Sequence, residues 1–150
     1  MRIALSGTGR IGRLFLRKYF SLMPPELELI AINTTAEVPA LAHLLKYDSV
    51  HGRWDVPVEA EGSELAVNGR RIPVLSDRNP ENLPWGELGV ELVIDATGKF
   101  TAREQLERHL AAGAQRALLT APGKNMDLTV VMGVNEHRYD PSRHRLVSAA

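Results

Sequence analysis

A glycine-rich turn near the start of the chain joins two segments of different periodicity. Residues 2–5 are a short apolar run, which predicts a buried β-strand. From residue 10 to residue 20 the apolar side chains recur at helical intervals, which predicts an amphipathic helix. Because Gly7, Gly9 and Gly12 lie between these segments or at their edge, the strand must turn into the helix within a few residues. A strand followed directly by a helix is the first unit of an α/β fold.

The same alternation continues along the chain. Apolar runs predict further strands at residues 27–32, 91–96, 116–120, 128–134 and 145–150. Pro39 is expected to open a helix that stops before Asp48. Thr101 is expected to cap another helix, with Glu104 completing a capping box and Gly113 ending the helix.

An insertion of different character interrupts this alternation. Between residues 53 and 75 every second residue tends to be apolar, and Asn68-Gly69 is a strong hairpin signal. The predicted fold class is therefore α/β, with a Rossmann-like doubly wound, mostly parallel sheet and a small antiparallel insertion. A chain of 150 residues with 44% hydrophobic content suits one such domain, spanning residues 1–150. Its ligand crevice is expected beyond the C-terminal ends of the strands.

Composition excludes several kinds of site. The sequence has no cysteine, and hence no disulfide, zinc-thiolate site or thiol nucleophile. Its 18 basic and 18 acidic residues give zero net charge, which argues against nucleic acid or an anionic membrane as the main partner. The five histidines form no ligand cluster, so no metal site is predicted, and Asp95 and Glu104 are assigned no catalytic role. Without a signal peptide or membrane-length apolar run, a cytoplasmic location is expected.

The glycine turn fits the G-x-G-x-x-G pattern of dinucleotide-binding proteins, in the required place between a strand and a helix. Gly7 would permit the tight turn, Gly9 would let the backbone approach a pyrophosphate, and Gly12 would allow close packing of the helix. The amides of Arg10 and Ile11 would face the phosphates at the positive end of the helix. The alternative is a tight turn that binds no ligand.

The end of the second strand bears on the choice of cofactor. An acidic residue expected there would favour NAD by binding the ribose hydroxyls, but the strand ends with Asn33 and Thr34. Without this carboxylate the site loses its discrimination against NADP, so NAD and NADP are both candidate cofactors. Glu37 is a possible substitute carboxylate, and Arg78 a possible partner for a 2′-phosphate.

Longer motifs resemble the phosphorylating glyceraldehyde-3-phosphate dehydrogenase family. Their order along the whole chain is that of the nucleotide-binding part of this family: Gly9-Arg10-Ile11-Gly12-Arg13, Leu41-Ala42-His43-Leu44-Leu45-Lys46-Tyr47-Asp48-Ser49-Val50-His51-Gly52, Ala96-Thr97-Gly98-Lys99-Phe100-Thr101, Thr120-Ala121-Pro122-Gly123-Lys124-Asn125 and Val131-Met132-Gly133-Val134-Asn135. The chain departs from the family where Thr8 replaces a phenylalanine, Thr34 an aspartate and Ala149 an asparagine. Thr34 resembles the arrangement in members that prefer NADP.

The resemblance also implies roles for individual residues. It implies adenosine contacts around Asn33, Thr34 and Arg78, contacts along the cofactor from Thr97, Gly98 and Phe100, and a position near the nicotinamide for Thr120. It implies no catalytic residue in this chain, because the nucleophilic cysteine is expected in a separate catalytic domain.

For the full-length enzyme the resemblance implies a homotetramer that oxidises glyceraldehyde 3-phosphate to an acyl phosphate, with hydride transfer to NAD(P). This chain alone is expected to bind nucleotide and catalyse nothing. Two alternatives stay open. One is a stand-alone NAD(P)-binding or sensing module, and the other is a related dehydrogenase acting on erythrose 4-phosphate.

Overall fold

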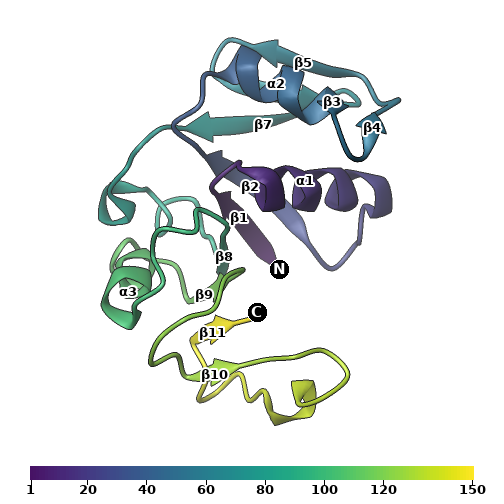
Figure 1. The fold of residues 1–150 in the computed structure, drawn as a ribbon. Helices are drawn as coiled ribbons and strands as arrows, with labels where there is room; N and C mark the ends of the chain where they lie inside the picture. Colours follow the sequence, from purple (N-terminus) through teal and green to yellow (C-terminus); the bar gives the residue numbers. More distant parts are fainter.

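A nine-stranded sheet runs through the computed structural model, which describes residues 1–150 (Figure 1). Its strands are β1 (Arg2–Ser6), β2 (Glu28–Asn33), β5 (Val58–Glu61), β6 (Glu64–Val67), β7 (Arg70–Leu75), β8 (Leu92–Asp95), β9 (Arg116–Leu119), β10 (Leu128–Thr129) and β11 (Leu146–Ser148). A separate two-stranded hairpin consists of β3 (Tyr47–Asp48) and β4 (Gly52–Arg53). The helices are α1 (Arg10–Leu22), α2 (Val38–Lys46) and α3 (Arg103–Ala111), with short 3-10 turns at Pro80–Asn82 and Glu136–Arg138.

The strand order is β10-β11-β9-β8-β1-β2-β7-β6-β5. All neighbours from β10 to β7 pair in parallel, whereas β6 pairs antiparallel with both β7 and β5. The chain leaves β1 toward β2 on one side and later returns to add β8 on the other side. This reversal is the switch point at which doubly wound sheets bind ligands. The predicted fold class is confirmed.

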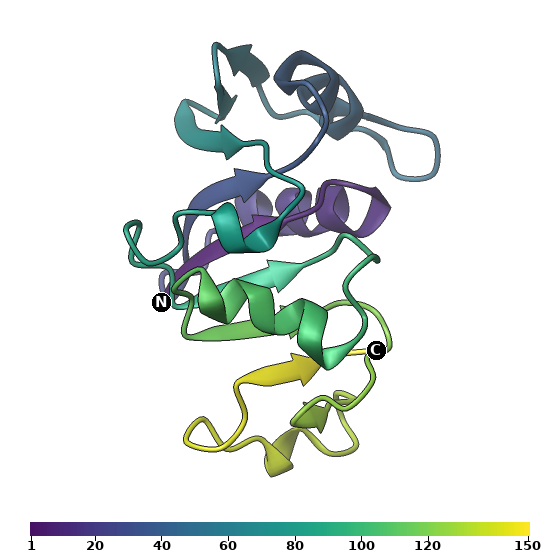
Figure 2. The same cartoon turned by 90° about the vertical axis from the view of Figure 1, so that its left-hand side faces the viewer.

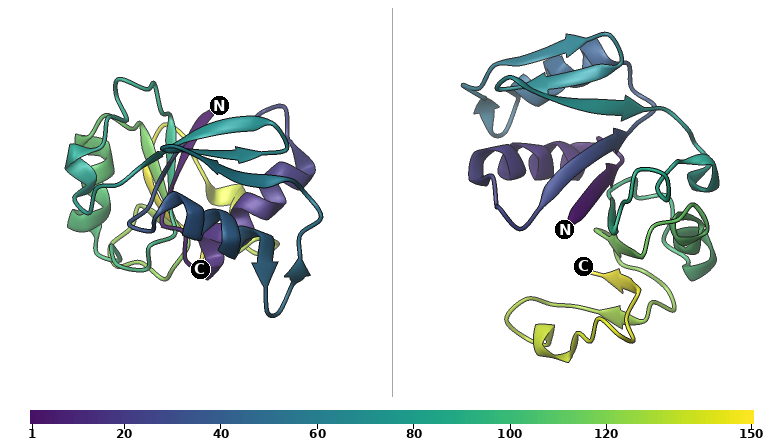
Figure 3. Two further views of the ribbon diagram at one scale, coloured as in Figure 1. Left: turned by 90° about the horizontal axis from the view of Figure 1, so that it is seen from above. Right: turned by 180° about the vertical axis from the view of Figure 1, so that it is seen from behind.

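The helices cover both faces of the sheet. Figure 2 shows α3 in front of the central strands and α1 behind them, and the view from above in Figure 3 again places them on opposite sides. On the side of α1 and α2, the largest core contains Leu16 and Tyr19 together with Leu45. On the other side, Leu106 of α3 packs with residues of β9 and β11. None of the three helices is long and apolar enough to cross a membrane.

The antiparallel insertion also forms as predicted. Asn68 and Gly69 have φ angles of 51° and 82°, as a two-residue hairpin turn between β6 and β7 requires. The last strand of the insertion returns to the main sheet, where Ile32 of β2 pairs with Val74 and Asn33 with Leu75. The insertion thus extends the sheet rather than forming a separate unit.

Two local predictions about element ends are wrong. Helix α3 begins at Arg103, and Thr101 and Glu104 form no capping box. Instead, the N-cap is Ala102, one residue after Thr101. Its amide donates a hydrogen bond to the Gln105 side chain at 3.1 Å, so this backbone donor at the start of the helix has a partner.

The strand predicted at residues 128–134 contains only Leu128–Thr129. Beyond it the Asn135 side chain accepts from the Val131 amide and donates to the Thr129 carbonyl, which folds the chain into a turn. Val134 therefore remains 68% exposed although its sequence pattern predicts a buried strand.

Three helical side chains also lie differently from their sequence pattern. Ile11, predicted on the apolar face of α1, is 53% exposed. Leu44 of α2 is 43% exposed, because Leu41 and Leu45 already fill the side that faces the core. Arg17, although charged, is partly buried and donates hydrogen bonds to the carbonyls of Leu45, Lys46 and Gly52. It thereby fastens the end of α2 and the β3–β4 hairpin to α1.

Candidate functional site

A cleft of about 490 Å³ opens at the C-terminal edge of the parallel strands. Ser6 at the end of β1, Asn33 at the end of β2 and Ala96 just after β8 mark its floor. The full lining is Ser6, Gly7, Thr8, Gly9, Arg13, Asn33, Thr34, Thr35, Ala36, Leu44, Asp77, Arg78, Ala96, Thr97, Lys99 and Phe100. The cleft therefore lies at the switch point of the sheet, where the fold predicts a ligand.

The three glycines of the turn have different surroundings. Gly7 has a φ of 97°, and a Cβ there would come within 2.6 Å of the Thr97 nitrogen. A Cβ on Gly12 would overlap the Gly7 carbonyl oxygen. A Cβ on Gly9, in contrast, would meet no atom within 4 Å, so the backbone is open to a ligand. These are the geometries that the pyrophosphate-binding motif requires.

The N-terminus of α1 lies beside this open glycine. Gly9 provides no side-chain cap, and the first turn has no acidic residue. The first amides of a helix have no partner within it, so those of Arg10 and Ile11 remain available to an anion at the positive end of the helix. The side chains of both residues are exposed and do not line the cleft, so their backbone is what they offer to a ligand.

Two departures from the family pattern contact each other. The hydroxyl oxygens of Thr8 and Thr34 lie 2.6 Å apart, and both residues are buried. The Thr34 hydroxyl also accepts from the Ala36 amide at 3.1 Å. The two threonines thus tie the glycine turn to the end of β2, and the sequence could not show that they form one contact.

Asn33 fixes the other side of the cleft through its side-chain amide. Its Oδ1 accepts from the Asp77 amide, and its Nδ2 donates to the Asp77 carbonyl, both at 3.0 Å. Nδ2 also lies 3.3 Å from the Ser6 hydroxyl, which accepts from it. These bonds hold the loop after β7 against the sheet, and they place Arg78 in the cleft wall.

The charged lining is mostly basic. Arg13, Arg78 and Lys99 line the cleft, and Asp77 is the acidic residue among its lining. Arg13 donates from Nη1 to the Thr8 carbonyl at 2.9 Å and so supports the glycine turn. This balance favours an anionic ligand.

Strongly held carboxylates lie away from the cleft. Backbone amides of His51 and Val50 lower the pKa of Asp48 to about 2. Burial raises the pKa of Asp127, but hydrogen bonds from the Leu146 amide and from Arg103 outweigh it, so the net direction is downward. The hydroxyl and amide of Ser142 lower the pKa of Asp140. These groups stabilise loops and are not part of the cleft.

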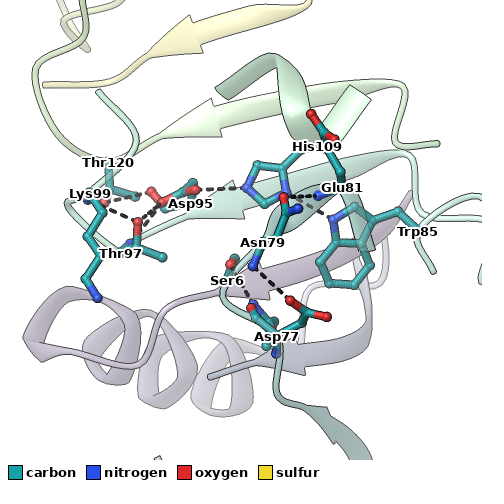
Figure 4. A network of polar contacts seen from close by, with 11 residues as sticks. Ser6, Asp77, Asn79, Glu81, Trp85, Asp95, Thr97, Lys99, His109 and Thr120 are labelled. Carbon is teal, nitrogen blue, oxygen red and sulfur yellow. Dashed lines mark hydrogen bonds and ion pairs between the residues drawn. The ribbon is translucent and has the colours of Figure 1, made fainter. Parts of the chain in front are cut away.

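A buried carboxylate supports the β8 side of the cleft (Figure 4). Asp95 Oδ1 accepts from the Thr97 amide at 2.9 Å and from the Thr97 hydroxyl at 2.7 Å. The Asp95 carbonyl accepts from the amide and hydroxyl of Thr120 at 3.1 and 3.2 Å. One residue therefore holds two of the predicted cofactor contacts.

The structure gathers most of the predicted site residues in one place. Those that line the cleft are Gly7, Gly9, Asn33, Thr34, Arg78, Thr97 and Phe100. Those that do not are Arg10, Ile11, Gly12, Gly98 and Thr120. Arg10, Gly12 and Gly98 adjoin lining residues in sequence, and Thr120 is linked to the lining residue Thr97 through Asp95. Glu37, the possible substitute carboxylate, is exposed at the start of α2 and does not line the cleft.

Some lining residues had no functional prediction. Lys99 lies between the predicted contacts Gly98 and Phe100, and Asp77 directly precedes Arg78. Their position next to predicted contacts could therefore have indicated that they line the cleft. Leu44 reaches the cleft only because α2 packs beside α1, and no local pattern shows this.

The fold agrees with comparisons to known proteins. The family described as glyceraldehyde 3-phosphate dehydrogenase, NAD binding domain, matches residues 1–103. The chain belongs to this family. This confirms the resemblance seen in the motifs, and the NAD in the family's description agrees with the predicted choice of a nicotinamide dinucleotide as cofactor.

Individual relatives match the chain over its full length. It is 49% identical over 150 residues to glyceraldehyde-3-phosphate dehydrogenase of Geobacillus stearothermophilus, covering 100% of this chain and 44% of that protein. It is 48% identical over 151 residues to glyceraldehyde-3-phosphate dehydrogenase 2 of Nostoc sp. (strain PCC 7120), covering 45% of that protein. It is 45% identical to glyceraldehyde-3-phosphate dehydrogenase 2 of Bacillus subtilis (strain 168), over 44% of its length. The chain thus spans less than half the length of these relatives.

Proposed function

We propose that residues 1–150 are the NAD(P)-binding domain of a glyceraldehyde-3-phosphate dehydrogenase. The observation that carries this proposal is the cleft at the switch point of the sheet, open at Gly9 to the uncapped N-terminus of α1. The pyrophosphate binds at the amides of Arg10 and Ile11, which Gly7 and Gly12 bring against the sheet.

The remaining predicted contacts extend from this anchor in two directions. The adenosine lies toward Asn33, Thr34 and Arg78, at the end of β2 and in the loop after β7. The nicotinamide arm runs past Thr97, Gly98 and Phe100 toward Thr120. Gly98 has a φ of 70°, which lets the chain turn sharply between Thr97 and Lys99.

The ribose pocket favours use of NADP beside NAD. The Thr34 hydroxyl is engaged by Thr8 and Ala36, and it carries no charge that would repel a 2′-phosphate. Arg78 supplies a positive charge in the cleft wall. Calorimetric titration of both dinucleotides tests this, and NAD binding more than about tenfold tighter than NADP, roughly 1.4 kcal/mol, contradicts it.

For the whole enzyme we propose phosphorylating oxidation of glyceraldehyde 3-phosphate in central carbon metabolism, in the cytoplasm and as a homotetramer. Its substrate is then a small aldehyde phosphate, and neither nucleic acid nor a membrane is proposed as a partner. NAD(P) would accept the hydride. The residues of this chain bind and orient it, whereas the nucleophilic thiol must come from a catalytic domain, because the chain has no cysteine.

Titration of NAD into the purified chain tests the binding proposal. We expect saturable one-site binding, and weaker binding by a Gly9→Val variant, whose side chain would occupy the open space over the helix amides. The matched control is Gly62→Ala, because Gly62 lies in the hairpin between β5 and β6, away from the cleft. A folded chain that binds no dinucleotide would contradict the proposal. NAD-dependent aldehyde oxidation by the chain alone would contradict the claim that catalysis requires a separate catalytic domain.

A further inference from the structure

A continuous chain of polar side chains crosses the core behind the cleft (Figure 4). The Trp85 Nε1 donates to His109 Nδ1 at 3.0 Å, and His109 Nε2 lies 2.8 Å from Asp95 Oδ2. All three residues are 0% exposed. Polar groups without access to water are costly unless their hydrogen bonds are made, so this arrangement is tightly constrained.

The direction of each hydrogen bond follows from the chemistry of the groups. An indole nitrogen can only donate, so His109 Nδ1 must accept and carries no proton. The imidazole proton is then on Nε2, where it is donated to the Asp95 carboxylate. Trp85 therefore selects the histidine tautomer that can hold Asp95.

Asp95 divides its two oxygens between the core and the cleft. Oδ2 faces His109, while Oδ1 accepts both the amide and the hydroxyl hydrogen of Thr97. The Thr97 hydroxyl in turn accepts from the Lys99 amide at 3.1 Å. The bond from His109 fixes the carboxylate rotamer, and with it the position of a residue in the cleft wall.

Thr97 also contacts the glycine turn. The space in which Gly7 would carry a Cβ is filled by the Thr97 nitrogen and Cα, at 2.6 and 2.8 Å. Since Gly7 has no side chain, the two backbones pack directly against each other. A displacement of Thr97 would therefore disturb the turn that leads into the N-terminus of α1.

We propose that His109 is a positioning residue for the dinucleotide cleft, acting through Asp95 on Thr97, with Trp85 as the group that fixes its tautomer. This inference rests on the proposed binding of NAD in the cleft. It assigns a role in binding to a side chain of α3 that does not line the cleft.

Two substitutions at one position separate positioning from packing. His109→Phe keeps the ring volume but removes both hydrogen bonds, whereas His109→Gln retains one acceptor for Trp85 and one donor for Asp95. Loss of a hydrogen bond to a buried carboxylate is expected to weaken NAD binding by about tenfold in His109→Phe. We expect His109→Gln to recover most of that loss.

Leu106→Ala is the matched control for helix stability. Leu106 lies on α3, is fully buried and packs with Ala117, Leu119 and Leu146 rather than with Asp95. It is expected to lower the midpoint of denaturation while leaving NAD affinity of the folded protein unchanged. If His109→Phe and Leu106→Ala reduce affinity equally, or if affinity in both His109 variants equals the wild-type value, the proposal is overturned.

A spectroscopic experiment covers the case in which His109→Phe does not fold. In Trp85→Phe the tautomer is no longer selected, so the ¹⁵N shifts of the His109 ring should move toward a mixture of tautomers, and exchange of the Thr97 amide should accelerate. Unchanged ring shifts and unchanged Thr97 exchange would overturn the proposal. The ring shifts and the Thr97 exchange are measured on the free protein, so they test the positioning network without NAD. Failure of the wild-type chain to bind NAD would instead overturn the proposed function.

Discussion

The cleft side of the molecule and the segment from residue 121 to residue 145 are built in different ways. Around the cleft, Thr8, Asn33, Thr34 and Asp95 are buried, and their side-chain hydrogen bonds join neighbouring strand ends. The later segment contains one two-residue strand and one short 3-10 turn. Several of its apolar side chains are exposed, with Met132 77% and Val134 68% accessible, whereas Ala121 and Met126 pack partly buried against the cluster around Leu106.

The difference shows which region of the chain is held in place by its own buried contacts. The cleft side has the buried contacts that hold a binding site in place before a ligand arrives, which reduces the cost of ordering on binding. The later segment is fixed mainly by local turns and by Asp127, which joins Arg103 to the amides of Arg145 and Leu146. Changes in the later segment should therefore alter stability without altering ligand binding.

The largest effect is expected at Gly12. In Gly12→Ala the new Cβ would overlap the Gly7 carbonyl, and because the obstacle is backbone the substitution should cost about 3 kcal/mol of unfolding free energy. Gly9→Ala is the matched control, since its Cβ meets no atom and an alanine at a helix N-cap costs about 1 kcal/mol. Urea denaturation measures both. Equal losses would show that the turn is not packed as described.

A smaller effect is expected in the other region. Asp127→Ala removes the acceptor for Arg103 Nη1 and for two backbone amides, and should cost about 2 kcal/mol. Its affinity for NAD should stay at the wild-type value, because Asp127 is not in the cleft lining. Denaturation and calorimetry on the same preparation check both statements. A substantial fall in affinity would break the proposed separation of the two regions.

Acid should open the exposed tip of the β3–β4 hairpin. The folded-state pKa of Asp48 is about 2, below the ordinary value of 3.8, so its stabilising contribution is present above pH 3.8 and is lost as the pH falls toward 2. We expect the Val50 and His51 amides, which donate to Asp48, to lose protection from exchange across this range. Asp48→Asn should abolish that pH dependence. Persistence of the transition in this variant would assign it to another group.

The smallest effect on stability is expected from the exposed apolar side chains. Replacing Met132 and Val134 by serine should change the unfolding free energy by less than about 0.5 kcal/mol, since neither side chain is buried. The same pair should lower self-association, because exposed apolar groups promote it. Light scattering of the variant and wild type at equal concentration measures this. A large loss of stability would mean that the segment is packed more tightly than its exposure indicates.

The sequence predicted the features that depend on local pattern. The strand–turn–helix around Gly7 and the hairpin at Asn68-Gly69 need only neighbouring residues, and both formed as expected. The capping box at Thr101 failed because Gln105, one position beyond Glu104, could serve a helix that begins later. The strand beyond Thr129 failed because the Asn135 side chain competes for its backbone groups.

Contacts between distant residues were not predictable in the same way. Thr8 and Thr34 were recognised separately as departures from a family pattern, but 26 positions separate them, and only the fold brings their hydroxyls together. Asp95 was placed at a strand end, and His109 was given no function. They pair because α3 packs on the sheet with His109 beside Asp95, and the pattern of apolar residues in the sequence does not predict that placement.

The most direct test of the account is to follow backbone amide resonances of the chain during a titration with NAD. We predict saturable shifts that are largest at Gly9, Arg10, Ile11 and Thr97, with the amides of Val131 and Val134 unmoved. Such a result would place the dinucleotide at the N-terminus of α1 and leave the later segment uninvolved. Saturable shifts confined to residues 121–145, or none at all in a folded chain, would contradict the claim that the cleft binds the cofactor.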